Sequence, residues 1–281
     1  MRNSSIHDSR FTNHGIHRAR GVTLLEMIMV IVITGIIGVA VAVFIRAPVE
    51  GYVDAARRAE LTDIADTALR RITRDLRTAL PNSVRVDPTG RYIEYLQTSG
   101  GGRYRAEPDS GGAGNVLDFA AADTAFDVIG QLPNAIAVGN RIAIYNLGAG
   151  TGTTDAYTGA NIAAITGLAA PTISIAAHLF PFPSPGKRFQ VVQYPVSYHC
   201  DLGTGRLRRY WGYTIQAVQP TAALPLDGST AALATNVSNC TFSYTTDGAA
   251  GRTGVASLTL QIAQSGETVR LFQQVHTNNV P

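Results

Sequence analysis

Hydrophobic and polar positions follow three different patterns along this chain of 281 residues, and each pattern predicts a different element. Residues 27–45 carry no charged side chain and are mostly aliphatic. A helix over residues 22–45 would rise roughly 36 Å at 1.5 Å per residue, enough to cross the ~30 Å hydrocarbon core of a bilayer. We therefore expect a transmembrane helix over residues 22–47.

Residues 48–80 are periodic rather than uniformly apolar. Their apolar side chains recur at intervals of three and four, which places them on one face of an amphipathic helix. Two acids stand four positions before an arginine, which is the favourable order in a helix. Pro48 is expected to bend the helix, and Pro81 to end it. The apolar positions are Leu61, Ile64, Ala65, Ala68, Leu69, Ile72, Leu76 and Leu80, and the charged pairs are Asp54–Arg58 and Asp66–Arg70.

After Pro81 the helical period fades, and short β-like runs alternate with turn-rich pieces. The sequence therefore predicts an α+β protein, a long N-terminal helix followed by an antiparallel β-rich head over residues 81–281. The expected strands are Arg91–Gln97, Asn115–Phe119, Asn140–Tyr145, Thr172–Ile175, Phe189–His199, Arg206–Ile215, Cys240–Tyr244, Gly254–Ala263 and Thr268–His276.

Two pairs of these runs are joined by short turns and predict hairpins. In the first hairpin the turn is residues 201–205, and in the second it is residues 264–267. Three glycine-rich stretches are expected to be loops, because glycine weakens strands and helices and is frequent in turns. They are Ser99–Gly102, Asp109–Gly114 and Gly148–Gly152.

The net charge of +3, from 23 basic and 20 acidic residues, is concentrated at the start of the chain. The first 20 residues contain four arginines and one aspartate, also +3, so the remainder holds 19 of each sign. Positive charge before an apolar span keeps that side in the cytoplasm, which predicts a periplasmic head. The neutral remainder gives no support for nucleic-acid binding.

The hexapeptide Gly21–Glu26, with the sequence GVTLLE, stands directly before the apolar run. A secretory signal is cut after its apolar region, whereas here the processing-type sequence comes first. That order predicts that the apolar helix stays in the mature protein. At this motif the chain resembles the type IV prepilins and the pseudopilins of type II secretion, with Val22 where that family most often has phenylalanine.

The resemblance implies that a prepilin peptidase removes residues 1–21 as a leader and methylates the new amine of Val22. The subunit would wait in the inner membrane as a single-pass protein. An assembly platform with its ATPase would then insert it among the major pilin and other minor pilins. Glu26 costs a few kcal/mol inside a bilayer, and the Val22 amine of a neighbour would neutralise it and set the axial register. The alternative is a tolerated interfacial acid.

Further segments resemble the O-type minor pilins of the mannose-sensitive haemagglutinin (MSHA) pilus system. The resemblance implies a minor subunit with a large head, which primes or caps a filament rather than forming its shaft. It is carried by Phe44–Pro48, Gly51–Tyr52, Arg70–Arg77, Leu80–Val86 and the tail Gln274–Pro281.

The only cysteines, Cys200 and Cys240, both lie on the expected periplasmic side. An oxidising compartment and an even number favour a disulfide between them. Two buried thiols are the alternative.

No catalytic residue, cofactor or metal site is expected from the head sequence. Its histidines stand at no metal-ligand spacing, and Gly148–Gly152 lacks the Lys-Ser/Thr of a phosphate loop. The basic run Arg206–Trp211 has aromatic neighbours and could contact DNA. In a strand Arg206, Arg208 and Tyr210 would share one face, and the neutral mature charge favours a solvated strand face over a nucleic-acid site.

Three other interpretations stay open. Residues 40–42, Ala-Val-Ala, would fit a signal-peptidase site, and cleavage there would release a soluble periplasmic protein. A J-type pseudopilin of type II secretion would share the fold and serve protein export. A membrane-anchored periplasmic enzyme or binding protein would need a convergent polar pocket in the head, which the sequence does not reveal.

Overall fold

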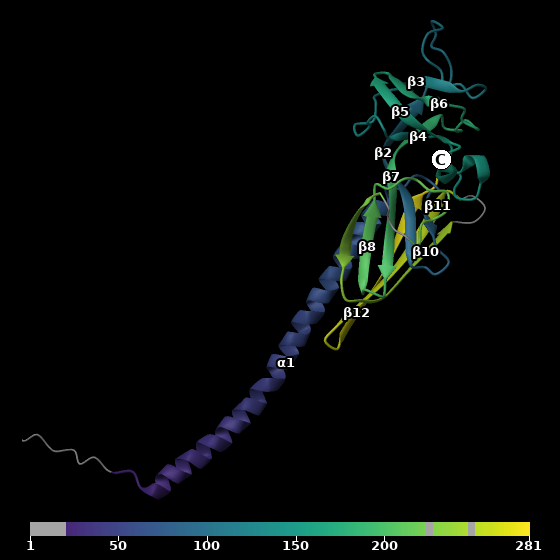
Figure 1. The fold of residues 1–281 in the computed structure, drawn as a ribbon. Helices are drawn as coiled ribbons and strands as arrows, with labels where there is room; N and C mark the ends of the chain where they lie inside the picture. The colour runs from purple at the N-terminus through teal and green to yellow at the C-terminus, as the bar shows by residue number, and fades with distance from the viewer. Residues whose placement is uncertain (1–20, 223–226, 247–250) are drawn as a thin grey trace, which may run out of the picture. The chain divides into compact units, whose positions relative to one another are not determined.

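The computed structural model describes residues 21–222, 227–246 and 251–281, so residues 1–20 of the expected leader lie outside it. Among the described residues a single long helix, α1 (Leu24–Leu76), is followed by a β-rich region (Figure 1). This arrangement confirms the α+β fold class. The chain divides into two compact units that meet between Asp54 and Ala55, so α1 contributes to both of them.

The helix α1 ends four residues before the predicted stop at Leu80. Pro48 lies inside α1 and does not end it. Beyond Leu76 the backbone finds partners on a strand instead: the Leu80 amide donates to the Leu96 carbonyl at 2.7 Å, and the Thr78 carbonyl accepts from the Thr98 amide at 2.9 Å. Pairing with a strand therefore replaces the last helical turn that the apolar period predicts.

The strands of the second unit form two sheets. In order along the chain they are β1 (Arg85–Val86), β2 (Tyr92–Tyr104), β3 (Asp123–Ile129), β4 (Arg141–Ala143), β5 (Ile162–Ala169), β6 (Thr172–His178), β7 (Arg188–Asp201), β8 (Arg206–Trp211), β9 (Ser229–Ala234), β10 (Val237–Thr246), β11 (Thr253–Gln264) and β12 (Glu267–Asn278). Two 3-10 turns, η1 (Gly152–Thr154) and η2 (Ala156–Thr158), lie between β4 and β5.

The larger sheet has the order β1-β2-β3-β6-β5-β4-β7-β8-β9, and β2 also pairs with β7. That extra pairing closes β2, β3, β6, β5, β4 and β7 into a ring. The long strands β2 and β7 serve both regions of the sheet, since β7 pairs with β4 near Val191 and with β8 from Val196 to Asp201. The smaller sheet is the antiparallel set β10-β11-β12.

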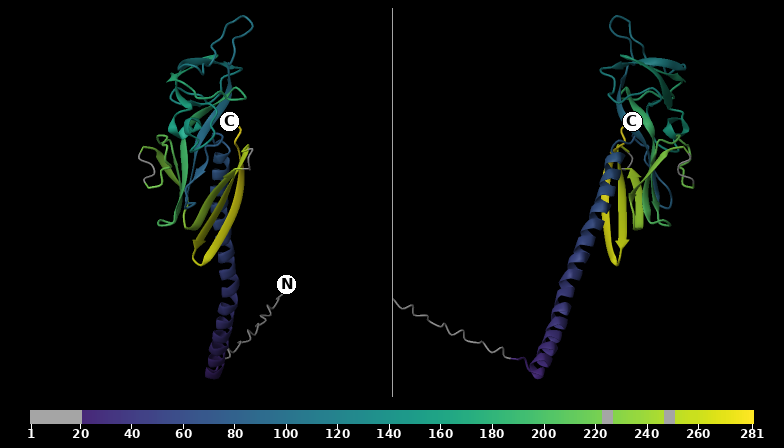
Figure 2. Two further views of the ribbon diagram at one scale, coloured as in Figure 1. Left: turned by 90° about the vertical axis from the view of Figure 1, so that its right-hand side faces the viewer. Right: turned by 60° about the vertical axis from the view of Figure 1, so that its left-hand side comes forward.

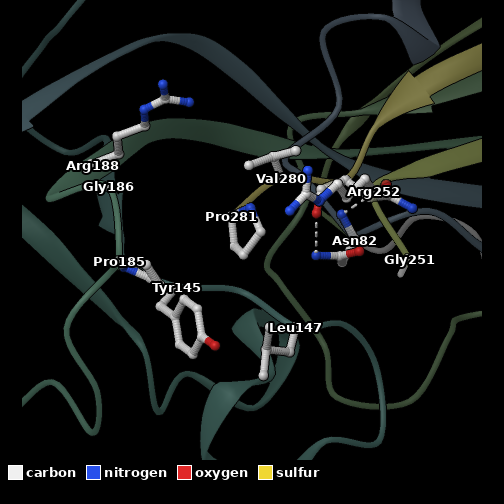
Figure 3. A pocket seen from close by; sticks show the side chains of 11 residues that line it. Asn82, Tyr145, Leu147, Pro185, Gly186, Arg188, Gly251, Arg252, Val280 and Pro281 are labelled. Carbon is white, nitrogen blue, oxygen red and sulfur yellow. Dashed lines mark hydrogen bonds between the residues drawn. The ribbon is translucent and has the colours of Figure 1, made fainter. Parts of the chain in front are cut away.

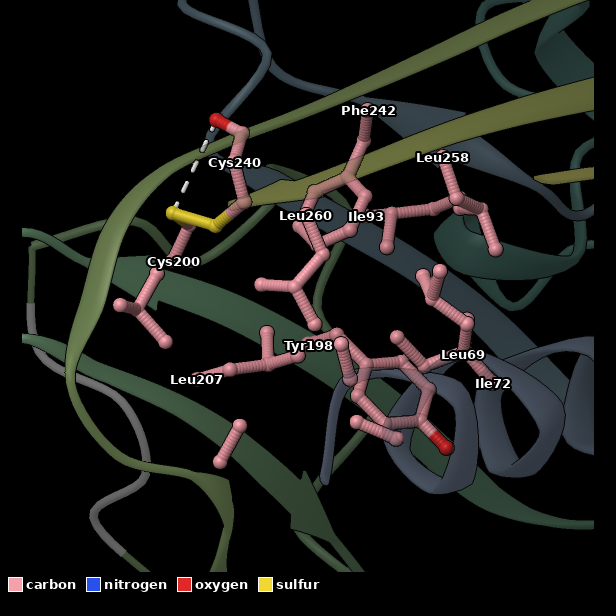
Figure 4. Packing of buried hydrophobic residues seen from close by; sticks show 14 of the residues in the cluster. Leu69, Ile72, Ile93, Tyr198, Cys200, Leu207, Cys240, Phe242, Leu258 and Leu260 are labelled. Carbon is pink, nitrogen blue, oxygen red and sulfur yellow. Dashed lines mark hydrogen bonds between the residues drawn. A yellow bond between two sulfur atoms is a disulfide. The ribbon is translucent and has the colours of Figure 1, made fainter. Parts of the chain in front are cut away.

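One core lies where α1, the larger sheet and the smaller sheet meet (Figure 4). The predicted helical stripe supplies its α1 side, and Leu61, Ala65 and Ile72 have no exposed surface. Strands β2 and β7 to β12 supply most of the rest. Figure 2 shows β12, in yellow, running alongside the upper turns of α1. The stripe therefore packs on the head of its own chain.

A second core fills the ring of strands. Its centre is aromatic: Phe126 and Phe189 are fully or almost fully buried and meet edge to face, with ring centroids 5.5 Å apart. Strand β2 reaches this core through glycines. A Cβ at Gly102 would lie 2.8 Å from Cζ of Phe189, so only glycine lets β2 and β7 approach this closely.

Both predicted hairpins are confirmed. Cys200 pairs with Leu207 across the turn between β7 and β8, and Ala263 pairs with Thr268 between β11 and β12. Two predictions are wrong. Ser99–Gly102 belongs to β2 rather than to a loop, because its glycines serve close strand approach. Asn115–Phe119 forms no strand; it makes isolated backbone hydrogen bonds, such as the Leu117 amide to the Arg105 carbonyl at 3.0 Å.

Candidate functional site

The motif Gly21–Glu26 occupies the start of α1. Gly21, Val22 and Thr23 precede the helix as exposed chain, and Glu26 lies in its first turn. The Thr23 hydroxyl oxygen accepts a hydrogen bond from the Glu26 amide at 3.2 Å. Thr23 thus caps the helix, and Thr-x-x-Glu is the capping-box pattern. The sequence motif did not predict this cap, although the spacing of Thr23 and Glu26 is that of a capping box.

The part of α1 that belongs to the first unit, Leu24–Asp54, and the residues just before it present apolar side chains on every side. Val22 is 64% exposed, Leu24 78% and Phe44 82%. Among the described residues α1 is the one helix long and apolar enough to cross a membrane, and its most apolar window has no buried residue. Exposed apolar surface of this extent is stable in lipid or against other apolar helices, and unfavourable in water.

A buried ion pair fastens the other end of α1 to the head. Both the Tyr198 hydroxyl, at 2.7 Å, and Nε of Arg209, at 2.8 Å, donate to the same carboxylate oxygen of Asp75. Arg71 adds a contact at 3.1 Å from the preceding helical turn. Burial raises the pKa of the Tyr198 hydroxyl, so it stays protonated and can donate.

The basic strand Arg206–Trp211 is β8, and its two faces differ less than expected, because Tyr210, on the predicted solvated face, is buried. Leu207 and Arg209 are buried, whereas Arg206 is exposed and Arg208 half-buried. Arg209 is committed to Asp75 and is therefore not available to a nucleic acid. The pairing of Arg209 with a helical aspartate was not foreseen, because it joins residues 134 positions apart.

A second buried acid, Glu94 on β2, is fully enclosed. Burial raises the pKa of its carboxyl group, while Arg85, at 2.7 Å, and the Tyr213 hydroxyl, at 2.9 Å, act in the opposite direction. The Arg85 guanidinium also stacks 3.6 Å from the ring centroid of Tyr157. All these partners are occupied within the head, which indicates a structural role.

Cys200 on β7 and Cys240 on β10 form a disulfide with a Cα–Cα distance of 6.1 Å, within the usual range (Figure 4). Both residues are buried. The bond connects the larger sheet to the smaller one. Arg91 reinforces the same junction, because its Nη1 donates to the Asn239 side chain at 3.0 Å and to the Cys240 carbonyl.

A groove of about 640 Å³ opens near the end of β12 (Figure 3). Figure 3 shows Val280 and Pro281 between Arg188 and Arg252, whose side chains are exposed. The groove lies where Leu80–Val86 meets the tail Gln274–Pro281, and there the Asn82 side chain donates to the Asn279 carbonyl at 3.0 Å. A hollow of this size is in the range of small-molecule sites.

The backbone around this groove is locally unusual. Tyr145 lines it with φ 53°, and Lys187, between two lining residues, has φ 54°. Non-glycine residues with such positive φ angles are uncommon and gather at functional sites. The head therefore contains a groove of mixed polar and apolar lining that was not expected from the sequence.

The glycine-rich loop Gly148–Gly152 does not resemble a phosphate site in the structure. The Asp155 carboxylate accepts from the Gly150 amide at 2.9 Å and from the Tyr157 amide at 2.8 Å. The Asp155 carboxylate thus already accepts hydrogen bonds from backbone amides, the groups that bind the ligand in a phosphate loop. Within residues 21–222, 227–246 and 251–281 no group of three His, Cys, Asp or Glu side chains could hold a metal ion.

Comparison with known proteins gives one match. Residues 16–42 match the family described as "Prokaryotic N-terminal methylation motif", a signature of type IV pilin-like proteins. The match spans the motif Gly21–Glu26 and most of the apolar run; its residues 16–20 lie outside the described residues. No curated protein and no solved structure matches the chain. The match supports a type IV pilin- or pseudopilin-like subunit that is anchored by a single helix.

Proposed function

We propose that this chain is a minor subunit of a type IV pilus, anchored in the inner membrane by residues 22–47, with its head in the periplasm. The observation that carries the proposal is the methylation motif placed directly before a helix whose apolar side chains are exposed on all sides. Such a helix needs lipid first and neighbouring helices later. The large head, which holds its own buried cores, suits a subunit that primes or caps a filament.

The first step of the proposed function is removal of residues 1–21 by a prepilin peptidase, followed by methylation of the Val22 amine. Gly21 and Val22 lie in exposed, non-helical chain, which is the form a peptidase binds. Mass spectrometry of the mature protein should give an N-terminus at methylated Val22. A mature start at Val43 would instead support secretion by cleavage after residues 40–42. Gly21→Leu should leave the uncleaved precursor in the membrane.

The second step is assembly, in which Glu26 pairs with the Val22 amine of a neighbouring subunit. Glu26 also stands at the capping-box position of its own helix, three residues after Thr23, and that position alone would favour a carboxylate there. Two variants separate the roles. Glu26→Gln retains a capping-box side chain without charge, and Glu26→Ala removes both. If pairing sets the register, both variants are processed but fail to enter filaments. Normal filaments with Glu26→Gln would mean that Glu26 serves only to cap its own helix.

Within this class we favour the O-type minor pilin of the MSHA system, because Leu80–Val86 and Gln274–Pro281 resemble that group. Partners would then be the prepilin peptidase, the assembly platform, the major pilin and other minor pilins. A J-type pseudopilin of type II secretion is the nearest alternative. Deleting the gene separates the two: loss of surface pili with normal protein export supports the pilus, and the reverse supports secretion.

A membrane-anchored binding protein is a second candidate, favoured by the groove between Arg188 and Arg252. Its test is a screen of small carboxylates and sugars for a rise in the melting temperature of the full chain in detergent. A ligand whose effect disappears in an Arg188→Gln/Arg252→Gln variant would support it. No rise with any compound, together with methylated Val22 in filaments, would leave the pilin function alone.

A further inference from the structure

A second groove, separate from the one near Pro281, lies between α1 and the edge strand β12. Its volume is about 410 Å³. Leu69 and Thr73 line it from α1, and Leu271 and Phe272 line it from β12. The helix and the strand are joined below it by an ion pair, in which Arg58 lies 2.9 Å from Glu267. The groove is therefore held open between two fixed elements of the same unit.

A buried hydroxyl without a partner lies in this groove. Thr73 is only 6% exposed, and its hydroxyl has no hydrogen-bond partner among the residues described. A threonine inside a helix commonly donates to the carbonyl four residues earlier, so this omission is informative. Buried polar groups in native proteins are nearly always satisfied, and an exception asks for a missing partner. A polar group brought into the groove next to Thr73 would supply such a partner.

The rim of the groove is cationic and aromatic. Arg74 and Arg77 are exposed, and neither has an acidic partner among the described residues. Arg70 and Asp66 also line the groove, but they neutralise each other, since Nε of Arg70 lies 2.6 Å from the Asp66 carboxylate. Phe272 is 63% exposed beside them. Arginine and exposed aromatic side chains are the residues most enriched at the centres of protein interfaces.

The strand side of the groove offers backbone groups as well. In the three-stranded sheet β12 pairs with β11 alone, so β12 is an edge strand. Edge strands present unpaired amides and carbonyls to which an extended segment can add. A volume of 410 Å³ holds a few side chains of such a segment. It does not accommodate a whole helix, whose diameter is about 10–12 Å.

We propose that the groove between α1 and β12 binds an extended acidic segment of another subunit, with its carboxylates between Arg74 and Arg77. An apolar side chain of the segment packs on Phe272, and a polar group of the segment pairs with the Thr73 hydroxyl. The proposal rests on the proposed function, because it needs a neighbouring subunit in an assembly. It adds to that function a contact made by the head, independent of Val22 and Glu26.

The direct test is binding of a labelled peptide to the full chain in detergent, followed by fluorescence anisotropy. The probe is acetyl-Leu-Glu-Val-Glu-Leu-amide, and its matched control has glutamine in place of both glutamates. We expect the glutamate peptide to bind at least about tenfold more tightly, and the preference to shrink as salt is raised. Equal binding of the two peptides, or no binding of either, would overturn the proposal.

Variants locate the site. Arg74→Gln/Arg77→Gln should weaken the glutamate peptide about tenfold or more, whereas Arg252→Gln, at the other groove, should leave it unchanged. Thr73→Val should weaken binding and raise the melting temperature, because it removes a buried hydroxyl that the free protein leaves unpaired. If Thr73→Val melts at a higher temperature but binds the peptide as the wild type does, the Thr73 hydroxyl takes no part in binding. Equal competition by free glutamate would mean a small-anion site and would contradict the proposal.

A cellular experiment separates this inference from the proposed function. Arg74→Glu/Arg77→Glu should be cleaved after Gly21 and held in the membrane as the wild type is, yet should reduce surface filaments. Normal filaments containing this variant would overturn the groove contact and leave the pilin function standing. Failure of the unaltered chain to be cleaved after Gly21 would instead overturn the function.

Discussion

The two halves of α1 form one helix that faces two different environments. In Leu24–Asp54 apolar residues occur on all sides and stay exposed, whereas from Leu61 to Leu76 they occupy one stripe that is buried or half-buried. Leu24 is 78% exposed, and Leu61 and Ile72 are not exposed at all. A uniformly apolar helix has no preferred inner face, so its partner must come from outside the chain. A periodic helix encodes the face that its own sheets cover.

The sharpest way to test this comparison is to break one similar ion pair in each unit. Arg209 and Asp75 lie 2.8 Å apart with side chains 7% and 10% exposed, and Arg46 and Glu50 lie 2.7 Å apart with side chains 78% and 59% exposed. We expect Arg209→Met to lower the free energy of unfolding by about 3–5 kcal/mol, because Asp75 stays buried without its cation. Arg46→Met should change it by less than about 1 kcal/mol.

Urea unfolding of the full chain in mild detergent, followed by circular dichroism, measures both changes. Equal small effects would mean that the Asp75 site hydrates when Arg209 is removed, and the contrast between the two units would then not extend to their ion pairs.

The disulfide gives the next largest expected effect. Cys200 and Cys240 are 40 residues apart in sequence, and closing a loop of that length stabilises a fold by roughly 4 kcal/mol on the chain-entropy account. Reduction, or Cys200→Ser/Cys240→Ser, should lower the melting temperature of the head. The helical signal of the exposed apolar segment should persist, because no cysteine lies in α1. Unchanged melting after verified reduction would show that the bond does not stabilise the head.

Shortening one isoleucine in each unit tests packing directly. Ile72→Ala should cost about 2–5 kcal/mol of head stability, since it leaves a cavity in the core between α1 and the sheets. Ile36 is 65% exposed, so Ile36→Ala should leave head unfolding unaltered and act only on anchoring or assembly. Both variants are compared by thermal unfolding in detergent. A loss of head stability with Ile36→Ala would mean that the two units do not unfold independently.

The smallest expected effect is a pH dependence confined to the head. Burial lowers the pKa of His199, whose ring stacks on Tyr92 with centroids 4.0 Å apart. The unfolded chain therefore binds a proton more readily than the folded one. The contribution of His199 to stability is complete above its ordinary pKa, near 6.5, and declines as the pH falls below that value.

The variant His199→Phe retains the stack but cannot titrate. It should lose that share of the decline in melting temperature between about pH 7 and pH 5, the range around an ordinary histidine pKa. The segment of α1 before Ala55 contains no histidine, so it has no group of this kind to contribute. An identical pH profile in the variant would assign the decline to other residues.

Local patterns in the sequence were enough to predict several elements of the fold. The stripe Leu61–Leu76 and the two hairpins follow from neighbours in sequence, because a helical face needs residues three or four apart and a hairpin needs one short turn. Strands β1, β3, β5 and β9 were missed. Strand β1 has only two residues, and β5 and β9 are rich in alanine, so all of them depend on pairing with neighbouring strands.

The candidate site divides in the same way. Gly21, Val22 and Glu26 form a contiguous motif, and the exposed surface behind it follows from composition alone. The grooves bring together residues far apart in the chain, such as Thr73 with Phe272 and Asn82 with Asn279. No local pattern predicts such pairs, since each depends on how the sheets and α1 pack.

The sequence by itself determined which segment is apolar enough to anchor the chain, which segment of α1 seeks its own core, and where processing is expected. Each of these depends on composition or on spacings of a few residues. Only the tertiary structure decided that Arg209 is buried against Asp75, that glycines draw β2 against Phe189, and that Thr73 lies unpaired beside Arg74 and Phe272. These features arise from long-range packing, in which the identity of a side chain's neighbours is set by the whole fold.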